Sequence, residues 1–191
     1  MLIFWEKRLV FLATPKAGST AIEVALESLA SLAVQRPREL KHVDIGAYRS
    51  FVEPWLGHIS QARFTTAALM REPIAWLQSW YRFRLRDEID VPAPDGFERF
   101  VRAYLADPAG MTDGVGSQSR FLNADGHRVD RIFRYENMDN FTHFLDDWLD
   151  CEISLPRVNV PPVADVTLSE ETTAELRDAL QPDFRLYAEL G

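Results

Sequence analysis

The sequence predicts an α/β fold in three layers, with a mainly parallel central sheet flanked by helices. The main observation is that short apolar, β-rich runs alternate along the chain with stretches of helical periodicity. The composition agrees, because 47% of the residues are hydrophobic and 26% are charged, as in ordinary globular proteins. At 191 residues the chain is expected to form a single domain over residues 1–191.

The first elements are two short strands and a helix. The β-rich runs Leu2–Trp5 and Leu9–Ala13 are separated by three charged residues, which predicts a hairpin. A turn-forming stretch follows, and apolar residues then recur at helical spacing from Ile22 to Leu32. The order strand, tight loop, helix is typical of a phosphate-binding turn in an α/β sheet.

Two further core strands are expected, Phe64–Met70 and Val129–Phe133. Pro73 suits the first turn of a helix that runs from Ile74 to about Arg86. Helical patterns or start signals predict the remaining helices, which are Ile45–Val52, Phe97–Leu105, Asp139–Leu149 and a final one capped by Ser169.

Composition excludes several classes of protein. A formal net charge of -8 argues against a nucleic-acid coat protein and against a polybasic membrane binder. The single cysteine, Cys151, excludes an internal disulfide and a cysteine-based zinc cage. The N-terminus lacks the pattern of a signal peptide, and no run approaches the ~18 apolar residues of a membrane span. We therefore expect a cytoplasmic protein with no stable membrane insertion and no nucleic-acid partner, whose oligomeric state the sequence does not reveal.

The most informative stretch is the loop that follows the second strand. It consists of Pro15, Lys16, Ala17, Gly18, Ser19 and Thr20. Gly18 permits a close backbone approach, the two hydroxyls donate hydrogen bonds, and the helix N-terminus attracts an anion. Lys16 adds a full positive charge. The alternative is a plain strand-to-helix turn with a Ser/Thr cap, but lysine, glycine and paired hydroxyls coincide here directly after an apolar strand.

This loop is P-loop-like without being a Walker A loop. A Walker A sequence places the lysine directly after its last glycine, whereas Lys16 precedes Gly18 by two positions. The predicted fold is therefore P-loop-like, with a shorter cradle that disfavours an ordinary nucleoside triphosphate site.

The order of residues 15–20 resembles the 5′-phosphosulfate loop of the sulfotransferase superfamily, whose donor is 3′-phosphoadenosine 5′-phosphosulfate. The run from Arg71 to Tyr81 resembles a second motif of that family, RxPxxRxxSxY, and also follows a predicted strand. The resemblance assigns the donor's 3′-phosphate to Arg71 and Ser79, and a guanidinium fork with a neutral hydroxyl suits a phosphate. It spans most of the chain and is greatest to compact bacterial relatives of the carbohydrate sulfotransferases.

The sequence departs from the second motif at one position. Trp76 stands where the family has its middle arginine, so a second basic contact would have to come from Arg82 or Arg84. Two short matches of low specificity follow, one at residues 133–138 and one at residues 157–159.

The resemblance implies transfer of a sulfuryl group to a hydroxyl or amine, without a metal, on a small-molecule or saccharide acceptor. Lys16 would stabilise the oxygen that leaves sulfur, and a base would take the acceptor's proton. Related enzymes place a His or Glu between the two motifs, where this chain has four candidates: His42, His58, Glu39 and Glu53. We favour His42, which follows a lysine as in the family, with His58 as the rival; either one could instead be a packed or surface histidine.

Other hypotheses remain open at this point. The polar stretch Gly114–Arg120 could lie over the donor, with Gln118 and Arg120 pointing inward, or be a flexible connector. The same strand–loop–helix could belong to a P-loop-like kinase, although no strand ends in a clear magnesium-binding Asp. A catalytically silent nucleotide-binding module is the third hypothesis.

Overall fold

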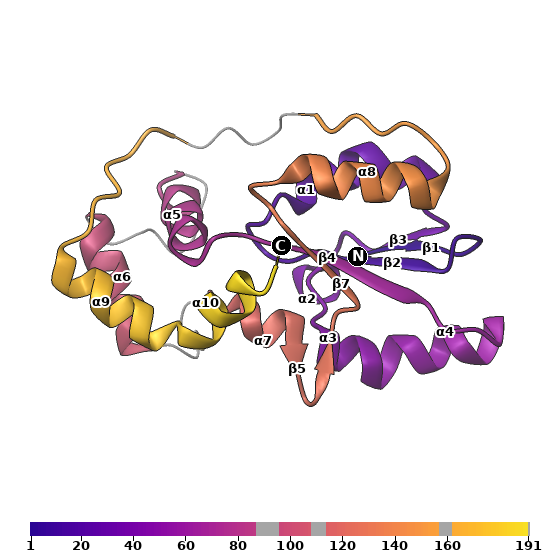
Figure 1. Ribbon diagram of the computed structural model, residues 1–191, viewed down its shortest axis with the longest axis horizontal. Coiled ribbons are helices and arrows are strands. Elements are labelled where there is room, and N and C mark those ends of the chain that lie inside the picture. The colour runs from indigo at the N-terminus through magenta and orange to yellow at the C-terminus, as the bar shows by residue number, and fades with distance from the viewer. Residues whose placement is uncertain (87–95, 108–113, 157–161, 191) are drawn as a thin grey trace.

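The computed structural model describes residues 1–86, 96–107, 114–156 and 162–190, and its centre is a five-stranded sheet with the order β3-β1-β2-β4-β7 (Figure 1). The strands are β1 (Leu2–Phe4), β2 (Leu9–Leu12), β3 (Leu32–Ala33), β4 (Thr65–Met70) and β7 (Arg131–Arg134). A separate hairpin consists of β5 (Asn123–Ala124) and β6 (His127–Arg128).

The sheet is mixed. Strand β1 pairs antiparallel with β2, as the predicted hairpin requires, and also with β3. The pairs β2–β4 and β4–β7 are parallel. The predicted mainly parallel arrangement therefore holds only for the β2-β4-β7 half. The other half is antiparallel, and its edge strand β3 was not predicted. The carboxyl ends of these three parallel strands meet at one edge of the sheet.

Helices lie on both faces of this sheet (Figure 1). Their bounds are α1 (Ser19–Leu26), α2 (Arg38–Lys41), α3 (Ile45–Ala47), α4 (Glu53–Ser60), α5 (Pro73–Arg84), α6 (Phe97–Ala106), α7 (Gln118–Leu122), α8 (Met138–Leu149), α9 (Glu170–Ala179) and α10 (Gln181–Ala188). Short 3₁₀ and π turns, η1 (Glu27–Leu29) and η2 (Tyr48–Val52), follow α1 and α3.

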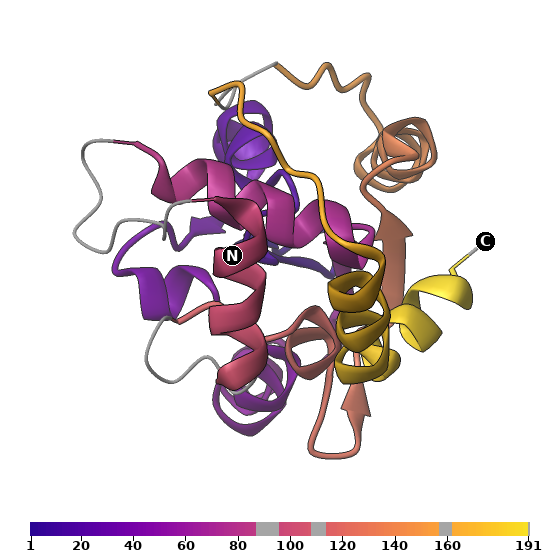
Figure 2. The ribbon, with the colours of Figure 1, turned by 90° about the vertical axis from the view of Figure 1, so that its left-hand side faces the viewer.

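Three apolar clusters hold these elements together. One buries Phe11 and Leu9 of the sheet against Phe141 of α8 and Ile22 of α1. A second lies on the opposite face, against α3 and α4, and a third joins α5, α6 and α9 beyond the carboxyl edge of the sheet. In Figure 2 these last helices face the viewer and cover that edge.

Several predicted elements are confirmed and others need correction. Strands β1, β2 and β4 and helices α5, α6 and α8 begin and end within two residues of their predicted bounds. The first helix ends at Leu26 and passes into η1, because Leu32 belongs to β3. The helix predicted to end at Val52 is followed directly by α4, which ends at Ser60. Pro54 lies in the first turn of α4, where a missing N–H is tolerated. The final helix is in fact two, α9 and α10.

In the parts of the chain that the structure describes, no helix is both long and apolar enough to cross a membrane.

Candidate functional site

The loop between β2 and α1 turns tightly at the carboxyl edge of the sheet. The amide of Thr14 donates to Leu12 at 3.0 Å, and the amide of Ala17 donates to Thr14 at 3.4 Å. Lys16 and Gly18 both have positive φ values, 61° and 79°. Such a loop gathers backbone N–H groups near the positive end of the following helix, which is an arrangement suited to an anion.

Gly18 is required here for two reasons. Its positive φ is strained for any residue with a Cβ, and a Cβ at this position would lie 2.8 Å from Cε2 of Tyr135. Tyr135 directly follows β7, so its ring packs against the loop from a strand two positions away in the sheet. The close approach therefore fixes the loop relative to the ends of the neighbouring strands.

Trp76 anchors the other side of the loop. Its indole Nε1 donates to the carbonyl of Pro15 at 2.9 Å, and its side chain is 1% exposed in the first turns of α5. At this position the resembled motif has an arginine. The tryptophan instead joins α5 to the loop, so it positions the loop without adding a positive charge.

The ammonium of Lys16 lies over aromatic rings of α5, 4.0 Å from the centre of Phe83 and 5.7 Å from that of Trp80. Burial lowers the pKa of Lys16 to about 8. Nearby positive charges lower this pKa in the same direction, and they belong to Arg86, Arg71 and Arg38. Four cations thus lie close enough to repel one another, and an anion among them would relieve that repulsion.

Arg71 is held by its backbone. The side chain of Gln118 accepts from the Arg71 amide and donates to the Arg71 carbonyl, each at 2.8 Å. The guanidinium lies 4.7 Å from the ring centre of Tyr135, and its buried Nε has no hydrogen-bond partner among the described residues. Burial lowers the pKa of the Arg71 guanidinium, while Tyr135 and Glu136 raise it. A buried cationic donor without a partner is stabilised when a ligand oxygen accepts from it.

Three arginines lie at the C-terminal end of α5 or just after it: Arg82, Arg84 and Arg86. The charge of Arg82 acts on Arg71, and that of Arg86 acts on Lys16. Arg84 is 4% exposed and lies 5.4 Å from the ring centre of Phe100, in the α5–α6 core. Of the two residues expected to replace the missing motif arginine, Arg82 therefore lies near the cluster and Arg84 packs inside the protein.

His42 lies beside the same loop. Its Nδ1 is 2.5 Å from the carbonyl of Ala13, and because a carbonyl only accepts, Nδ1 carries the proton and Nε2 is free as a base. The pKa of His42 is lowered to about 4, mainly by burial and also by the charges of Lys41 and Arg38, while the Ala13 hydrogen bond opposes the shift. The imidazole is therefore neutral at pH 7, in the tautomer that can take a proton at Nε2.

His42 lines a cavity of about 230 Å³ together with the phosphate-loop residues Thr14 and Pro15. Its other lining residues come from α5, from the start of α3 and from the segment around α7; they are Asp44, Trp76, Val115, Gly116, Ser117, Gln118, Arg120 and Phe121. The hydroxyl of Thr14 is buried and has no partner among the described residues. The cavity therefore offers a base and a free hydroxyl to a small polar molecule.

The structure brings most of the predicted catalytic and phosphate-binding residues to the loop and leaves one away from it. Those at the loop are Lys16, Gly18, Arg71 and His42. His58 lies away from it: it is exposed on α4, and α4 leads into the amino end of β4, opposite the loop.

The other predicted contacts have mixed surroundings. Ser79 is half-buried on α5, three residues beyond Trp76. Ser19 is 6% exposed and Thr20 half-buried in the first turn of α1, whereas Ala17 is 1% exposed in the core. The residue 157–159 match lies outside the described residues.

A buried carboxylate, Asp183, holds the segment that contacts Arg71. Asp183 of α10 accepts from the amides of Gln118 and Ser119 and from the Ser119 hydroxyl, at 2.9, 3.2 and 2.6 Å. Burial raises the pKa of Asp183, and the three donors oppose that shift. Asp183 thereby fixes the start of α7, and α7 presents Gln118 to Arg71. Sequence reasoning identified Gln118 as a residue that could point inward, and the short match at residues 133–138 contains Tyr135, but the sequence gave no signal for Asp183 or Arg38.

These residues form a cluster of cations beside the loop, with a neutral histidine nearby. Among the described residues no group of three or more side chains could hold a metal ion. No protein-family model matches the chain, and no curated protein matches it. The chemistry of the site must therefore be argued from its geometry and from the two sequence motifs.

Proposed function

We propose that the protein transfers a sulfuryl group from 3′-phosphoadenosine 5′-phosphosulfate to a hydroxyl or amine acceptor, on a three-layer P-loop-like fold. One observation carries the proposal: the ring of Tyr135 packs against Gly18 of the first motif and lies 4.7 Å from the guanidinium carbon of Arg71 of the second, so the two motifs meet at one place. Their charges meet beside a loop whose backbone suits an anion. A donor with two phosphate groups and a sulfuryl group suits such a cluster.

The loop and Arg71 divide the donor's charges between them. The N–H groups of Lys16 and of residues 18–20, together with the positive end of α1, would hold the 5′-phosphate. Arg71, whose Nε lacks a partner among the described residues, would hold the 3′-phosphate, with Ser79 as a neutral donor on the next helix. Lys16 would stabilise the bridging oxygen as its bond to sulfur breaks.

His42 would act as the base. In the transfer, the acceptor oxygen or nitrogen forms a bond to sulfur, the bond between sulfur and the 5′-phosphate oxygen breaks, and the acceptor proton moves to Nε2 of His42. The hydrogen bond from Nδ1 to Ala13 supports this role, because it fixes the required tautomer. The cavity beside His42 has room for a small molecule or one sugar unit of a saccharide.

A titration with 3′-phosphoadenosine 5′-phosphate, followed by calorimetry, tests the proposal. We expect saturable binding that weakens at least roughly tenfold in Lys16→Ala and in Arg71→Ala. Lys7→Ala is the matched control, since Lys7 lies in the β1–β2 turn at the opposite end of β2.

Titrations with two other ligands show whether the 3′-phosphate is recognised and whether the site prefers ATP. AMP, which lacks the 3′-phosphate, should bind more weakly than the bisphosphate, and Arg71→Ala should abolish that difference. Binding of ATP with magnesium and none of the bisphosphate would contradict the proposal and favour the kinase hypothesis.

A further inference from the structure

Strand β7 forms an open edge of the sheet. Strand β7 pairs with β4 along one edge, and no strand among the described residues pairs with its other edge. The amide of Tyr135 donates to a carbonyl of β4, and backbone groups alternate along a strand, so Phe133 also faces β4. The N–H and C=O of Ile132 and the N–H of Arg134 therefore point outward. An edge with free backbone groups of this kind is a template for another strand.

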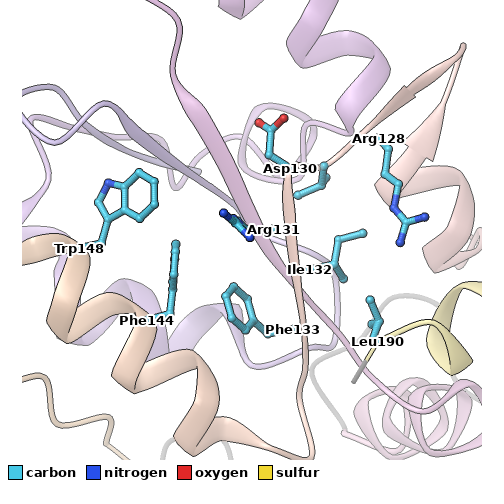
Figure 3. Close-up of a pocket in the computed structure, with 9 residues that line it drawn as sticks. Arg128, Asp130, Arg131, Ile132, Phe133, Phe144, Trp148 and Leu190 are labelled. Carbon is cyan, nitrogen blue, oxygen red and sulfur yellow. The ribbon is translucent and has the colours of Figure 1, made fainter.

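A groove of about 520 Å³ runs along this edge. Figure 3 shows Phe144 and Trp148 of α8 on one side of the strand and Leu190 and Arg128 on the other. Between them lie the side chains of the strand itself. The groove thus combines apolar walls with unpaired backbone groups, which is the arrangement that strand addition uses.

We propose that this groove binds a second copy of the chain, with the two β7 strands paired antiparallel about a two-fold axis at Ile132. In this register the N–H of each Ile132 donates to the C=O of the other. The outward amide of each Arg134 then lies beside Asp130 of the second copy, a residue just before β7 whose own amide donates to the Thr66 hydroxyl at 2.9 Å. The two sheets join into one, and the interface uses the same surface of both copies.

The side chains favour this register over its neighbours. Pairing about Ile132 places Arg131 opposite Phe133, where a guanidinium can lie on a ring. It also places Arg134 opposite Asp130, whose carboxylate already accepts from Thr66, Arg49 and Arg63 of its own chain. Pairing about Arg131 would put two arginines opposite each other. Pairing about Phe133 would put Asp130 opposite Glu136. Like charges directly opposite destabilise a sheet, so only the central register is free of them.

A second copy also suits the walls of the groove. Helix α8 runs beside β7 on one face of the sheet, and a two-fold axis perpendicular to the sheet brings the two α8 helices together on that face (Figure 1). Phe144 and Trp148, both partly exposed, would then pack between the copies. An extended segment of another protein could use the backbone groups, but it would not account for a register in which each Arg131 lies opposite Phe133 and no like charges face each other.

Sedimentation velocity on the full chain, from about 1 to 100 µM, tests the proposal. We expect a dimer whose dissociation constant rises at least about tenfold in Ile132→Lys, because two lysines then face each other at the axis. Ile132→Pro should have a similar effect, since it removes an outward N–H and leaves the pairing with β4 intact. Ile132→Val is the matched control and should keep the dimer. Near-ultraviolet circular dichroism and thermal unfolding establish that each variant is folded.

Hydrogen exchange on the unaltered chain gives a second measurement that no substitution can disturb. The Ile132 amide should exchange slowly at high concentration and rapidly at low concentration, whereas the Phe133 amide should be protected at both. A chain that stays monomeric throughout the range overturns the proposal. So does a dimer that survives Ile132→Lys but is lost on Trp55→Ser, because the exposed apolar stripe of Phe51, Trp55 and Ile59 would then be the interface.

Discussion

At the residue scale, the site depends on a few side chains whose partners are far away in the sequence. The motif residues Lys16 and Arg71 could be found from the sequence because local patterns mark them. Gln118 reaches Arg71 across 47 positions, and Tyr135 reaches Gly18 from another strand. Such contacts depend on the sheet order and leave no local signal. The sequence showed that Trp76 stands where the motif has an arginine, but it did not show that the Trp76 indole donates to the Pro15 carbonyl.

The hydrogen bond from Trp76 to the loop has a testable contribution. Trp76→Phe keeps most of the apolar surface and leaves the Pro15 carbonyl without its donor. We expect it to lower the free energy of unfolding by about 1 kcal/mol and to weaken binding of 3′-phosphoadenosine 5′-phosphate several-fold. Urea denaturation and calorimetry measure the two effects. Trp80→Phe is the control for the unfolding measurement: Trp80 is also buried, but its Nε1 has no partner among the described residues, so no hydrogen bond is lost.

The pKa of His42 predicts how stability depends on pH. Folding lowers that pKa from its ordinary value of 6.5 to about 4, so between these values the unfolded chain binds more protons than the folded one. The contribution of neutral His42 to the free energy of unfolding is fully present above pH 6.5 and is lost as the pH falls toward 4. Asparagine can keep the donor to Ala13 without titrating, so His42→Asn should show a smaller loss of stability over this window. Denaturant midpoints at several pH values measure it, and an equal loss in both chains would argue against a buried neutral His42.

At the scale of elements, the short strands and the regular helices could be predicted because their periodicity and caps are local. Ser169 caps α9 by accepting from Thr172, as expected. The two-residue strand β3 was missed, since Leu32 also fits the preceding helical pattern and pairing with β1 decides its state. Helix α7 lies where the glycine-rich sequence suggested a connector, and it is fixed by a carboxylate of α10 rather than by its own pattern.

The link between α10 and α7 predicts a coupled effect. Asp183→Ala leaves two buried amides and a hydroxyl without their acceptor, so we expect unfolding to become easier by about 1–3 kcal/mol. Because α7 carries Gln118, the same variant should weaken binding of 3′-phosphoadenosine 5′-phosphate, although Asp183 is not placed to touch it. Asp178→Ala, on the exposed side of α9, is the control and should change neither quantity. A destabilised variant with unaltered affinity would show that Arg71 does not depend on this link.

At the scale of the whole molecule, the charge distribution opposes the net charge. The chain carries a formal charge of -8, yet four cations surround the loop at the carboxyl edge of the sheet. Composition predicted an acidic protein and argued against a nucleic-acid coat protein and a polybasic membrane binder, but it left a local basic site open. It could not show that cations from four separate segments form a cluster, because only the fold brings them together.

The cation cluster predicts that the affinity for 3′-phosphoadenosine 5′-phosphate depends on the salt concentration. Attraction between the cluster and 3′-phosphoadenosine 5′-phosphate is screened as the ionic strength rises, so the dissociation constant should increase about tenfold between 50 and 500 mM salt, on the order of one unit in its logarithm. The slope should be smaller in Lys16→Ala, which removes one of the cations. Calorimetry at several salt concentrations measures both slopes. Equal slopes would mean that Lys16 does not share the ligand's charge.

Trp80 gives the protein an optical reporter of its own site. Its ring lies 5.7 Å from the ammonium of Lys16 and 5.3 Å from the guanidinium carbon of Arg38, so two positive charges act on one chromophore. The emission energy of an indole depends on the electric field across its ring. An anion that neutralises these charges should therefore shift the fluorescence of Trp80, and binding can be followed on the unlabelled chain by stopped-flow spectroscopy.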